Sequence, residues 1–294
     1  MAGISAAVVT LLDAPFTAAL FATEIVYTDR VLYRTLMYSL FAAVIAYALN
    51  NHVFDVQPLF TATGHVYVYS PLEYLEVAAI ALICSAPAGL GVNFLFVHIK
   101  TLMLAIPSLF RGAVSGALVG AIGLGLWFGL GLEPRHVMGV SEETIMEIVS
   151  GEGNPLLEVW WVLVLLVVLK AVATGLTLGA GGSAGALVPA MFLGGVSGAA
   201  VYHFLGGIGY ATAGDPSLYV AAGIAAGLVA VVQVPLAAIA FVMEVFGATY
   251  GPPAIVSCFL TYMIVKRLRL YAEPRKRAVE AAAEADAPTA TNGT

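Results

Sequence analysis

The sequence predicts an all-α polytopic membrane protein, and three observations predict it: the composition, the apolar runs and an internal repeat. Of the 294 residues, 61% are hydrophobic and 10% are charged, whereas a soluble domain carries about 25% charged residues. The alternating pattern of a membrane β-barrel is absent from the sequence. Five or more apolar stretches approach the roughly 17–25 residues that cross a bilayer as a helix. They include 36–49 with its flanks, 75–99, 112–132, 156–178 and 252–265.

The internal repeat predicts the same pair of helices twice. Residues 2–25, AGISAAVVTLLDAPFTAALFATEI, return at 222–245 as AGIAAGLVAVVQVPLAAIAFVMEV, with 9 of 24 positions identical and no gap. Glu24 and Glu244 occupy equivalent places in the two copies. Carboxylates inside a membrane often have a functional role, but these two lie near helix ends. We therefore expect them to bond to backbone groups or to meet interfacial water.

The basic residues are unevenly distributed, and this predicts an orientation. The segments 50–71 and 131–158 carry Arg135 as their only basic residue, among several acidic ones. The ranges 28–35 and 100–111, together with the C-terminal part, hold 10 of the 12 lysines and arginines. Positively charged loops stay in the cytoplasm. We therefore expect a multi-pass protein of the cell membrane with a cytoplasmic C-terminus.

Little in the sequence indicates chemistry of other kinds. Cys84 and Cys258 lie in apolar stretches and are expected to be buried, without a disulfide. The five histidines lack ligand spacing, so we expect no metal, and no cofactor is implied. Paired aspartates, H-E-x-x-H and a Ser–His arrangement on membrane helices are all missing. The chain is therefore not expected to be an enzyme, and nothing points to nucleic acid as a partner.

The most informative stretch is 179–198, GAGGSAGALVPAMFLGGVSG, in which seven glycines interrupt a hydrophobic segment. Non-helical backbone at membrane depth is tolerated only where protein or a watery cavity surrounds it, and broken helices mark binding sites in transporters. We expect the break at 179–185, with Pro189 in the first turn of the next helix. The free amides would belong to Ala186, Leu187 and Val188.

A helix that starts inside the membrane is suited to binding an anion. Its unpaired amides and the positive end of its dipole both favour a negative guest. Without a full positive charge, an ion binds and can still leave, as conduction requires. The alternative, that the glycines serve close helix packing, fits Gly194 and Gly198. Lys170 has several possible roles: it can snorkel, pair with a carboxylate, or add positive potential to an anion path.

These motifs resemble those of the CLC family of chloride channels and transporters. GALVP (185–189) is similar to the family's anion-selectivity motif G-x-F-x-P, and VPLAAIAFVMEVFG (234–247) is similar to its A-P-L-x-x-x-x-x-x-x-E segment. Tyr271 falls where the family has a tyrosine whose hydroxyl faces the central chloride. The order and spacing of the motifs, together with the repeat, carry the resemblance from residue 1 to about 275. The resemblance implies an anion site at Gly185, Ala186, Leu187, Val188, Pro189 and Tyr271.

The resemblance also implies an inverted-repeat architecture with broken, re-entrant helices, assembled as a homodimer in the lipid bilayer. Each subunit would have its own pore for chloride, and the end of the first hairpin with 31–49 and 234–268 would form the dimer face. The expected segments are a closing hairpin of the first repeat at 1–27, the second inverted repeat at 28–268, a juxtamembrane segment bearing the pore tyrosine at 269–277, and a disordered tail at 278–294.

Part of the family pattern is missing from residues 1–294. The first-half loops G-K/R-E-G-P and G-S-G-x-P, which supply the gating glutamate and a chloride-binding serine in the family, cannot be found. The resemblance therefore implies an N-terminally truncated CLC chain. A late gene start or a fragment is our first expectation. A natural truncation and a separate polypeptide that supplies the rest are the alternatives.

Two further departures bear on mechanism. Ile25 replaces the glutamate that relays protons in the family's proton-coupled members, which leaves Glu24 as the candidate relay residue. Leu187 stands where the family usually has phenylalanine. We therefore predict passive chloride conduction. The alternatives are a Cl⁻/H⁺ antiporter, a carrier of another anion such as fluoride or nitrate, and an inactive fragment.

Overall fold

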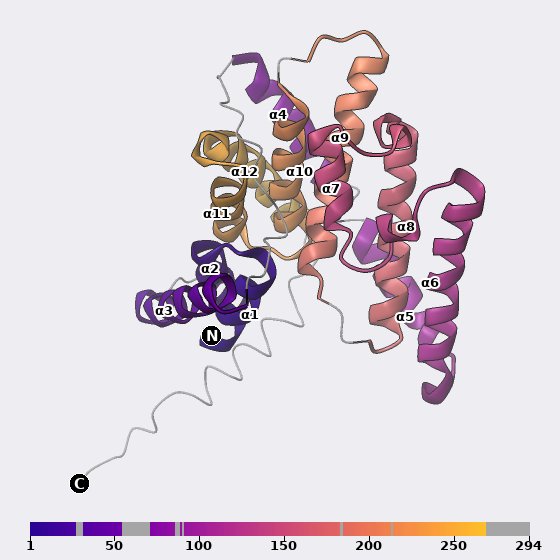
Figure 1. Cartoon of the computed structure of the whole chain (residues 1–294), viewed down its shortest axis with the longest axis horizontal. Coiled ribbons are helices and arrows are strands. Elements are labelled where there is room, and N and C mark those ends of the chain that lie inside the picture. The colour runs from indigo at the N-terminus through magenta and orange to yellow at the C-terminus, as the bar shows by residue number, and fades with distance from the viewer. Residues whose placement is uncertain are drawn as a thin grey trace.

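The computed structural model describes residues 1–27, 32–54, 71–85, 89, 91–182, 185–212 and 214–268, and their regular elements are all helices (Figure 1). The predicted all-α class is therefore confirmed. The α-helices are α1 (Ala2–Leu12), α2 (Pro15–Val26), α3 (Tyr33–His52), α4 (Pro71–Ser85), α5 (Val92–Leu104), α6 (Ser108–Leu130), α7 (Glu142–Ser150), α8 (Trp160–Gly179), α9 (Leu187–Gly207), α10 (Pro216–Val231), α11 (Pro235–Val245) and α12 (Gly251–Leu268). Short 3₁₀ turns are η2 (Pro134–His136), η3 (Pro155–Glu158) and η4 (Ala248–Tyr250).

Four helical segments within the described residues are long and apolar enough to cross a membrane. These are α6, α8, α9 and the segment Ala248–Lys266, which joins η4 to α12. The predicted crossing at 36–49 is the 20-residue helix α3, which is not among the four. Arg34 near its start and the polar run 50–52 at its end lower its hydropathy. The chain is thus a membrane protein by its helices as well as by its composition.

The predicted crossing at 75–99 is helical at both ends, and residues 86–88 and 90 in its middle lie outside the described residues. Helix α4 ends at Ser85 and α5 begins at Val92. The sequence between them holds Pro87 and two glycines, at 89 and 91. Proline lacks the N–H that a helix needs and glycine is a weak helix former. The single crossing over 75–99 therefore stays a prediction.

The internal repeat corresponds to two hairpins with the same local geometry. Hairpin α1–α2 turns at Asp13 and hairpin α10–α11 turns at Gln233, which are equivalent positions in the repeat. Both residues have a left-handed backbone, with φ of 54° and 63°. The helix that follows each turn starts with a proline, Pro15 or Pro235, whose fixed φ suits the first helical position.

Glu24 joins the two hairpins by bonding to the start of α11. Its carboxylate accepts hydrogen bonds from the amides of Leu236, at 3.0 Å, and Ala237, at 2.8 Å. The first amides of a helix have no partner within the helix. A carboxylate at this end also complements the helix dipole. Glu24 therefore acts as an N-terminal cap that a different helix supplies.

Glu244 makes the reciprocal contact, at the start of α2. Its carboxylate accepts hydrogen bonds from the amides of Phe16, at 2.9 Å, and Thr17, at 2.7 Å, and from the Thr17 hydroxyl, at 2.5 Å. Each helix thus ends with a glutamate that caps the other. This geometry requires α2 and α11 to run antiparallel, as halves of an inverted repeat do. The expected backbone bonding of both glutamates is confirmed.

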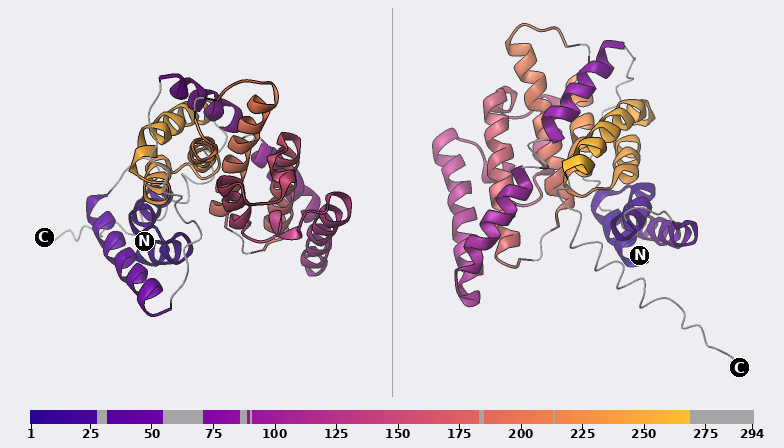
Figure 2. Two further views of the ribbon diagram at one scale, coloured as in Figure 1. Left: turned by 45° about the horizontal axis from the view of Figure 1, so that its top comes forward. Right: turned by 180° about the vertical axis from the view of Figure 1, so that it is seen from behind.

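A third helix packs on each hairpin, so that two similar three-helix groups lie side by side (Figures 1 and 2). Helix α3 packs on α1 and α2, and α12 packs on α10 and α11. The Ser5 hydroxyl donates to the Ser39 carbonyl, at 2.8 Å, and the Ser257 hydroxyl donates to the Ala222 carbonyl, at 2.7 Å. In space α3 thus joins the first hairpin, while the division at residue 28 stays a prediction.

Helices α9 and α10 approach each other through glycines. A Cβ at Gly194 would overlap the carbonyl oxygen of Gly223, and one at Gly198 would overlap that of Tyr219. Small residues let membrane helices come this close. The interpretation of Gly194 and Gly198 as packing residues is confirmed. Helix α8 packs against the outer side of α9, with α5 and α6 beyond it.

Candidate functional site

The chain breaks its helical course between α8 and α9, as the glycines predict. Helix α8 ends at Gly179 and α9 begins at Leu187. Gly181 has a φ of +90°, a conformation that glycine adopts without steric cost. Pro189 is the third residue of α9 and lies in its first turn. Residues 183 and 184 of this segment lie outside the described residues.

The start of α9 presents backbone donors without acceptors. The Ala190 amide closes the first turn by donating to the Ala186 carbonyl, at 3.0 Å. The amides of Ala186, Leu187 and Val188 have no hydrogen-bond acceptor among the described residues. A helix N-terminus with free amides and a positive dipole end attracts anions.

A cavity of about 400 Å³ opens at this helix start. Its walls come from five segments of the chain. Leu11 of α1 and Val119 of α6 contribute, and the irregular segment 137–140 forms another side. Helix α8 and the start of α9 complete the enclosure. Their lining residues are Lys170, Ala173, Thr174, Thr177, Gly185, Leu187, Val188 and Pro189.

Among the described residues that line this cavity, Lys170 alone is charged, and it is 2% exposed. Its ammonium donates hydrogen bonds to the carbonyls of Val137, at 3.0 Å, and Gly139, at 2.7 Å, and to the Ser141 hydroxyl, at 2.8 Å. It also lies 5.2 Å from the centre of the Phe192 ring. Lys170 therefore fastens the segment 137–141 against α8 and α9.

The structure brings together most of the expected anion-site residues. Gly185, Leu187, Val188 and Pro189 share the cavity, whereas Ala186 is exposed beside it and does not line it. Tyr271 lies outside the described residues, so its expected place near the ion stays a prediction.

The proposed relay residue lies elsewhere. Both oxygens of Glu24 accept hydrogen bonds at the start of α11, and Glu24 does not line the cavity. Ile25 packs partly buried against the core. A relay role for Glu24 stays a prediction.

Sequence reasoning did not place Lys170, Thr174 and Thr177 together at the site. A signal for them exists, because their spacing of four and three residues puts all three on one face of α8. The partners of Lys170 had no such signal, since they lie in an irregular segment.

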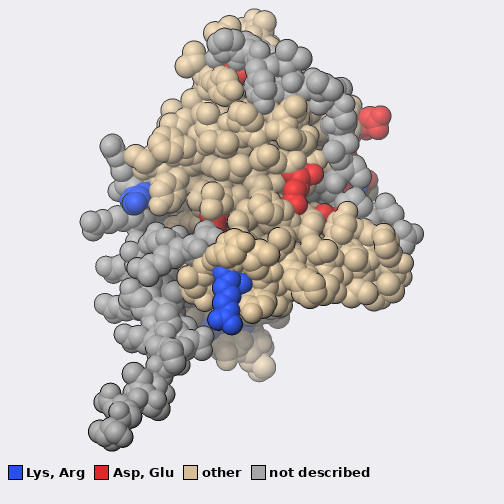
Figure 3. All heavy atoms as spheres, turned by 90° about the vertical axis from the view of Figure 1, so that its left-hand side faces the viewer, with Lys and Arg blue, Asp and Glu red and all other residues tan. Residues whose placement is uncertain are grey.

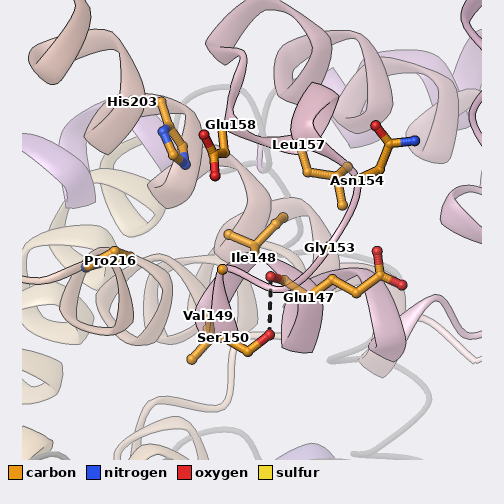
Figure 4. Close-up of a pocket in the computed structure, with 11 residues that line it drawn as sticks. Glu147, Ile148, Val149, Ser150, Gly153, Asn154, Leu157, Glu158, His203 and Pro216 are labelled. Atoms are coloured by element: carbon orange, nitrogen blue, oxygen red, sulfur yellow. Dashed lines mark hydrogen bonds between the residues drawn. The ribbon is translucent and has the colours of Figure 1, made fainter.

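A second cavity, of about 210 Å³, lies between α7, η3 and the end of α9. His203 and Glu158 lie side by side in it, with Glu147 on the opposite side (Figure 4). Within the described residues, no group of three metal-ligating side chains is assembled. Nearby, Arg135 forms exposed ion pairs with three glutamates, at 133, 143 and 147.

His136, in η2 of the same region, is buried and bonded to a neighbouring helix. Its Nδ1 lies 3.0 Å from the hydroxyl of Thr144 in α7. Burial lowers the pKa of His136, because a charged imidazolium is poorly solvated there. The residue thus anchors η2 to α7 in its neutral form.

Comparison with known proteins identifies the family. Residues 1–266 match the family described as voltage gated chloride channel. An uncharacterized protein of Methanocaldococcus jannaschii is 25% identical over 271 residues, which cover 90% of this chain and 62% of that protein. The chain thus spans about three fifths of the length of this relative.

Two solved structures share the fold. A crystal structure of a CLC-type fluoride/proton antiporter has a TM-score of 0.72 and 20% identity, over 90% of this chain and 62% of that one. A slow cyanobacterial Cl⁻/H⁺ antiporter has a TM-score of 0.75 and 18% identity, over 95% of this chain and 64% of that one. The inverted hairpins, the glycine break and the family match agree, and the chain belongs to the voltage gated chloride channel family.

Proposed function

We propose that the chain forms a transmembrane path for chloride or a related small anion, with the ion seated at the start of α9. The observation that carries this proposal is that the amides of Ala186, Leu187 and Val188 have no acceptor among the described residues. They lie beside a cavity whose described lining includes no acidic side chain. Backbone dipoles fixed at this point attract a halide and hold it weakly enough for release.

We propose passive conduction as the mode of transport. Ile25 cannot carry a proton, and both oxygens of Glu24 are engaged by backbone amides. The second candidate is proton-coupled antiport. It is favoured by the two similar structures, which are described as a fluoride/proton and a Cl⁻/H⁺ antiporter.

We further propose a homodimer in the cell membrane, with the C-terminus in the cytoplasm. The face formed by α2, α3, α11 and α12 carries few charged side chains (Figure 3). On α3 alone, Tyr38 is 61% exposed and Phe41 is 70% exposed. Apolar surface of this kind is suited to lipid or to a second subunit.

The test of transport is anion efflux from liposomes that contain the purified protein. We expect efflux of chloride, with nitrate and fluoride measured in parallel to rank the anions. Val188→Pro removes one free amide at a first-turn position, where proline is accepted, and should slow efflux severalfold. Val188→Ala keeps the amide and serves as the matched control. If liposomes with the wild-type protein show no anion efflux, the proposal is refuted.

The test of coupling uses the same liposomes under an imposed pH gradient. Passive conduction predicts that the reversal potential follows the anion gradient alone. Antiport predicts that the potential shifts with pH and that anion flow drives protons uphill. A pH-dependent shift would replace the passive mode with the antiport mode and leave the anion path in place.

A further inference from the structure

The polar side chains of α8 lie on one face and meet at the cavity. Apart from its two initial tryptophans, α8 is an apolar helix that carries Lys170, Thr174 and Thr177 as its polar side chains. Residues spaced by four and by seven positions project from the same side of a helix. All three line the cavity together with the start of α9. A polar stripe on a membrane helix is costly against lipid, and here it faces the cavity.

Among the residues that the structure describes, no acidic side chain contacts the charge of Lys170. Its three hydrogen-bond acceptors are two carbonyls and a hydroxyl, all neutral. Arg135 and its glutamates pair with one another and not with Lys170, and Glu142 attracts the ammonium only through space. A buried charge without a counter-charge is expensive. An anion in the adjoining cavity would offset that cost.

Helix α8 can act on an ion in two ways, through the electric field of a charge or through a direct hydrogen bond, and different residues serve each. An ammonium has three N–H donors, and those of Lys170 are all engaged, so it acts through its field and not as a ligand. The Thr177 hydroxyl donates to the Ala173 carbonyl, at 2.9 Å. The Thr174 hydroxyl has no partner among the described residues and is free to donate to an ion.

We propose that Lys170 and Thr174 form a second ion-binding wall of the cavity, beside the start of α9, whereas the engaged Thr177 hydroxyl is not part of it. The Thr174 hydroxyl donates to the anion there, and the Lys170 charge raises its affinity and repels cations. The inference rests on the proposed anion path and deepens it, because it names the side chains that set affinity and charge selection.

The test is chloride binding to the full chain in detergent, measured by isothermal titration calorimetry. We expect Lys170→Met to weaken binding by about tenfold or more, since a full charge acts strongly across a low-dielectric cavity. Lys170→Arg keeps the charge and should stay within about threefold of the wild type. Thr174→Val should weaken binding by about threefold to tenfold, the loss of one hydrogen bond.

Two control variants distinguish the effect of the Lys170 charge on the anion from its role in holding segment 137–141 in place. Ser141→Ala removes one acceptor of Lys170 and keeps its charge, so binding should stay near that of the wild type. Thr177→Val removes a hydroxyl that is already engaged, with the same expected result. If Ser141→Ala weakens binding as much as Lys170→Met, or if Thr174→Val and Thr177→Val are alike, the second wall is disproved.

Lys170→Met can lose binding simply because segment 137–141 is no longer held in place. Thr174→Val is free of this problem, because it leaves the hydrogen bonds of Lys170 to that segment intact.

Failure of the proposed function is a separate outcome. Wild-type protein that binds chloride with the expected variant pattern, but passes none in liposomes, would refute transport and uphold the wall. If the wild-type protein transports chloride but Lys170→Met binds chloride as well as the wild type does, transport is upheld and the second wall is refuted. Wild-type protein that binds no chloride would overturn the wall.

Discussion

At the residue scale, the two reciprocal glutamates are the most informative contacts in the molecule. Intramembrane carboxylates suggest proton transfer, yet Glu24 and Glu244 each bond to a helix start in the other repeat. A hydrogen bond to a charged acceptor is stronger than one to a neutral acceptor. Their first role is therefore to hold the two halves together.

This role predicts a graded loss of stability. Glu24 is 9% exposed, whereas Glu244 is more open to water, so Glu24→Gln should cost about 1–3 kcal/mol and Glu244→Gln less. Thermal unfolding in detergent measures both. Glu152→Gln, on an exposed residue of the acidic segment, is the control and should leave the melting temperature unchanged. Equal melting temperatures for Glu24→Gln and Glu152→Gln would contradict the capping role.

The residue scale is also where sequence reasoning reached its limit. Free amides at 186–188 follow from the glycines and Pro189, because local rules govern a helix start. The partners of Lys170 do not follow, because Val137 and Ser141 lie 33 and 29 residues away and carry no periodic pattern. Only the fold brings them to α8.

At the element scale, the repeat and the helix breaks decide the architecture. The hairpins could be predicted because two copies of one pattern carry the same proline and the same turn. The break before α9 was predicted from clustered glycines. The link between α4 and α5 lies partly outside the described residues, so the single crossing expected over 75–99 stays a prediction.

The close contact of α9 and α10 gives a prediction at this scale. Gly194→Ala places a methyl group against the Gly223 carbonyl, so the helices must separate and stability should fall by about 1–3 kcal/mol. Gly206→Ala, in the same helix, meets nothing within 4 Å and should be neutral or slightly stabilising. Thermal unfolding compares the two, and chloride titration reports whether the α9 amides have shifted. Equal stability of the variants would refute the close-contact role.

At the scale of the whole molecule, two three-helix groups meet through α2 and α11. The broad face that they share carries few charged side chains (Figure 3) and exposes Tyr38 and Phe41, which favours the proposed assembly of two copies through it. The partner on this face could not be predicted from composition alone, since lipid and protein both accept apolar side chains.

Truncation of one exposed ring on this face tests the assembly. Phe41→Ala on α3 should shift the equilibrium from dimer toward monomer on dilution, because large side chains dominate the energy of an interface. Phe128 of α6 is 82% exposed but lies away from this face, so Phe128→Ala should leave the dimer unchanged. Light scattering in detergent measures both masses. A monomeric wild-type protein, or equal behaviour of the variants, would refute the proposed face.

The crossed glutamate caps have a consequence for biosynthesis. Because Glu244 lies 220 positions after Glu24, the ribosome needs about 10 to 45 s to reach it at 5–20 residues per second. Throughout that interval the newly inserted α2 waits with the amides of Phe16 and Thr17 uncapped. The first hairpin, α1–α2, is therefore completed only when the second, α10–α11, has been made. The two hairpins then dock and cap each other in one step.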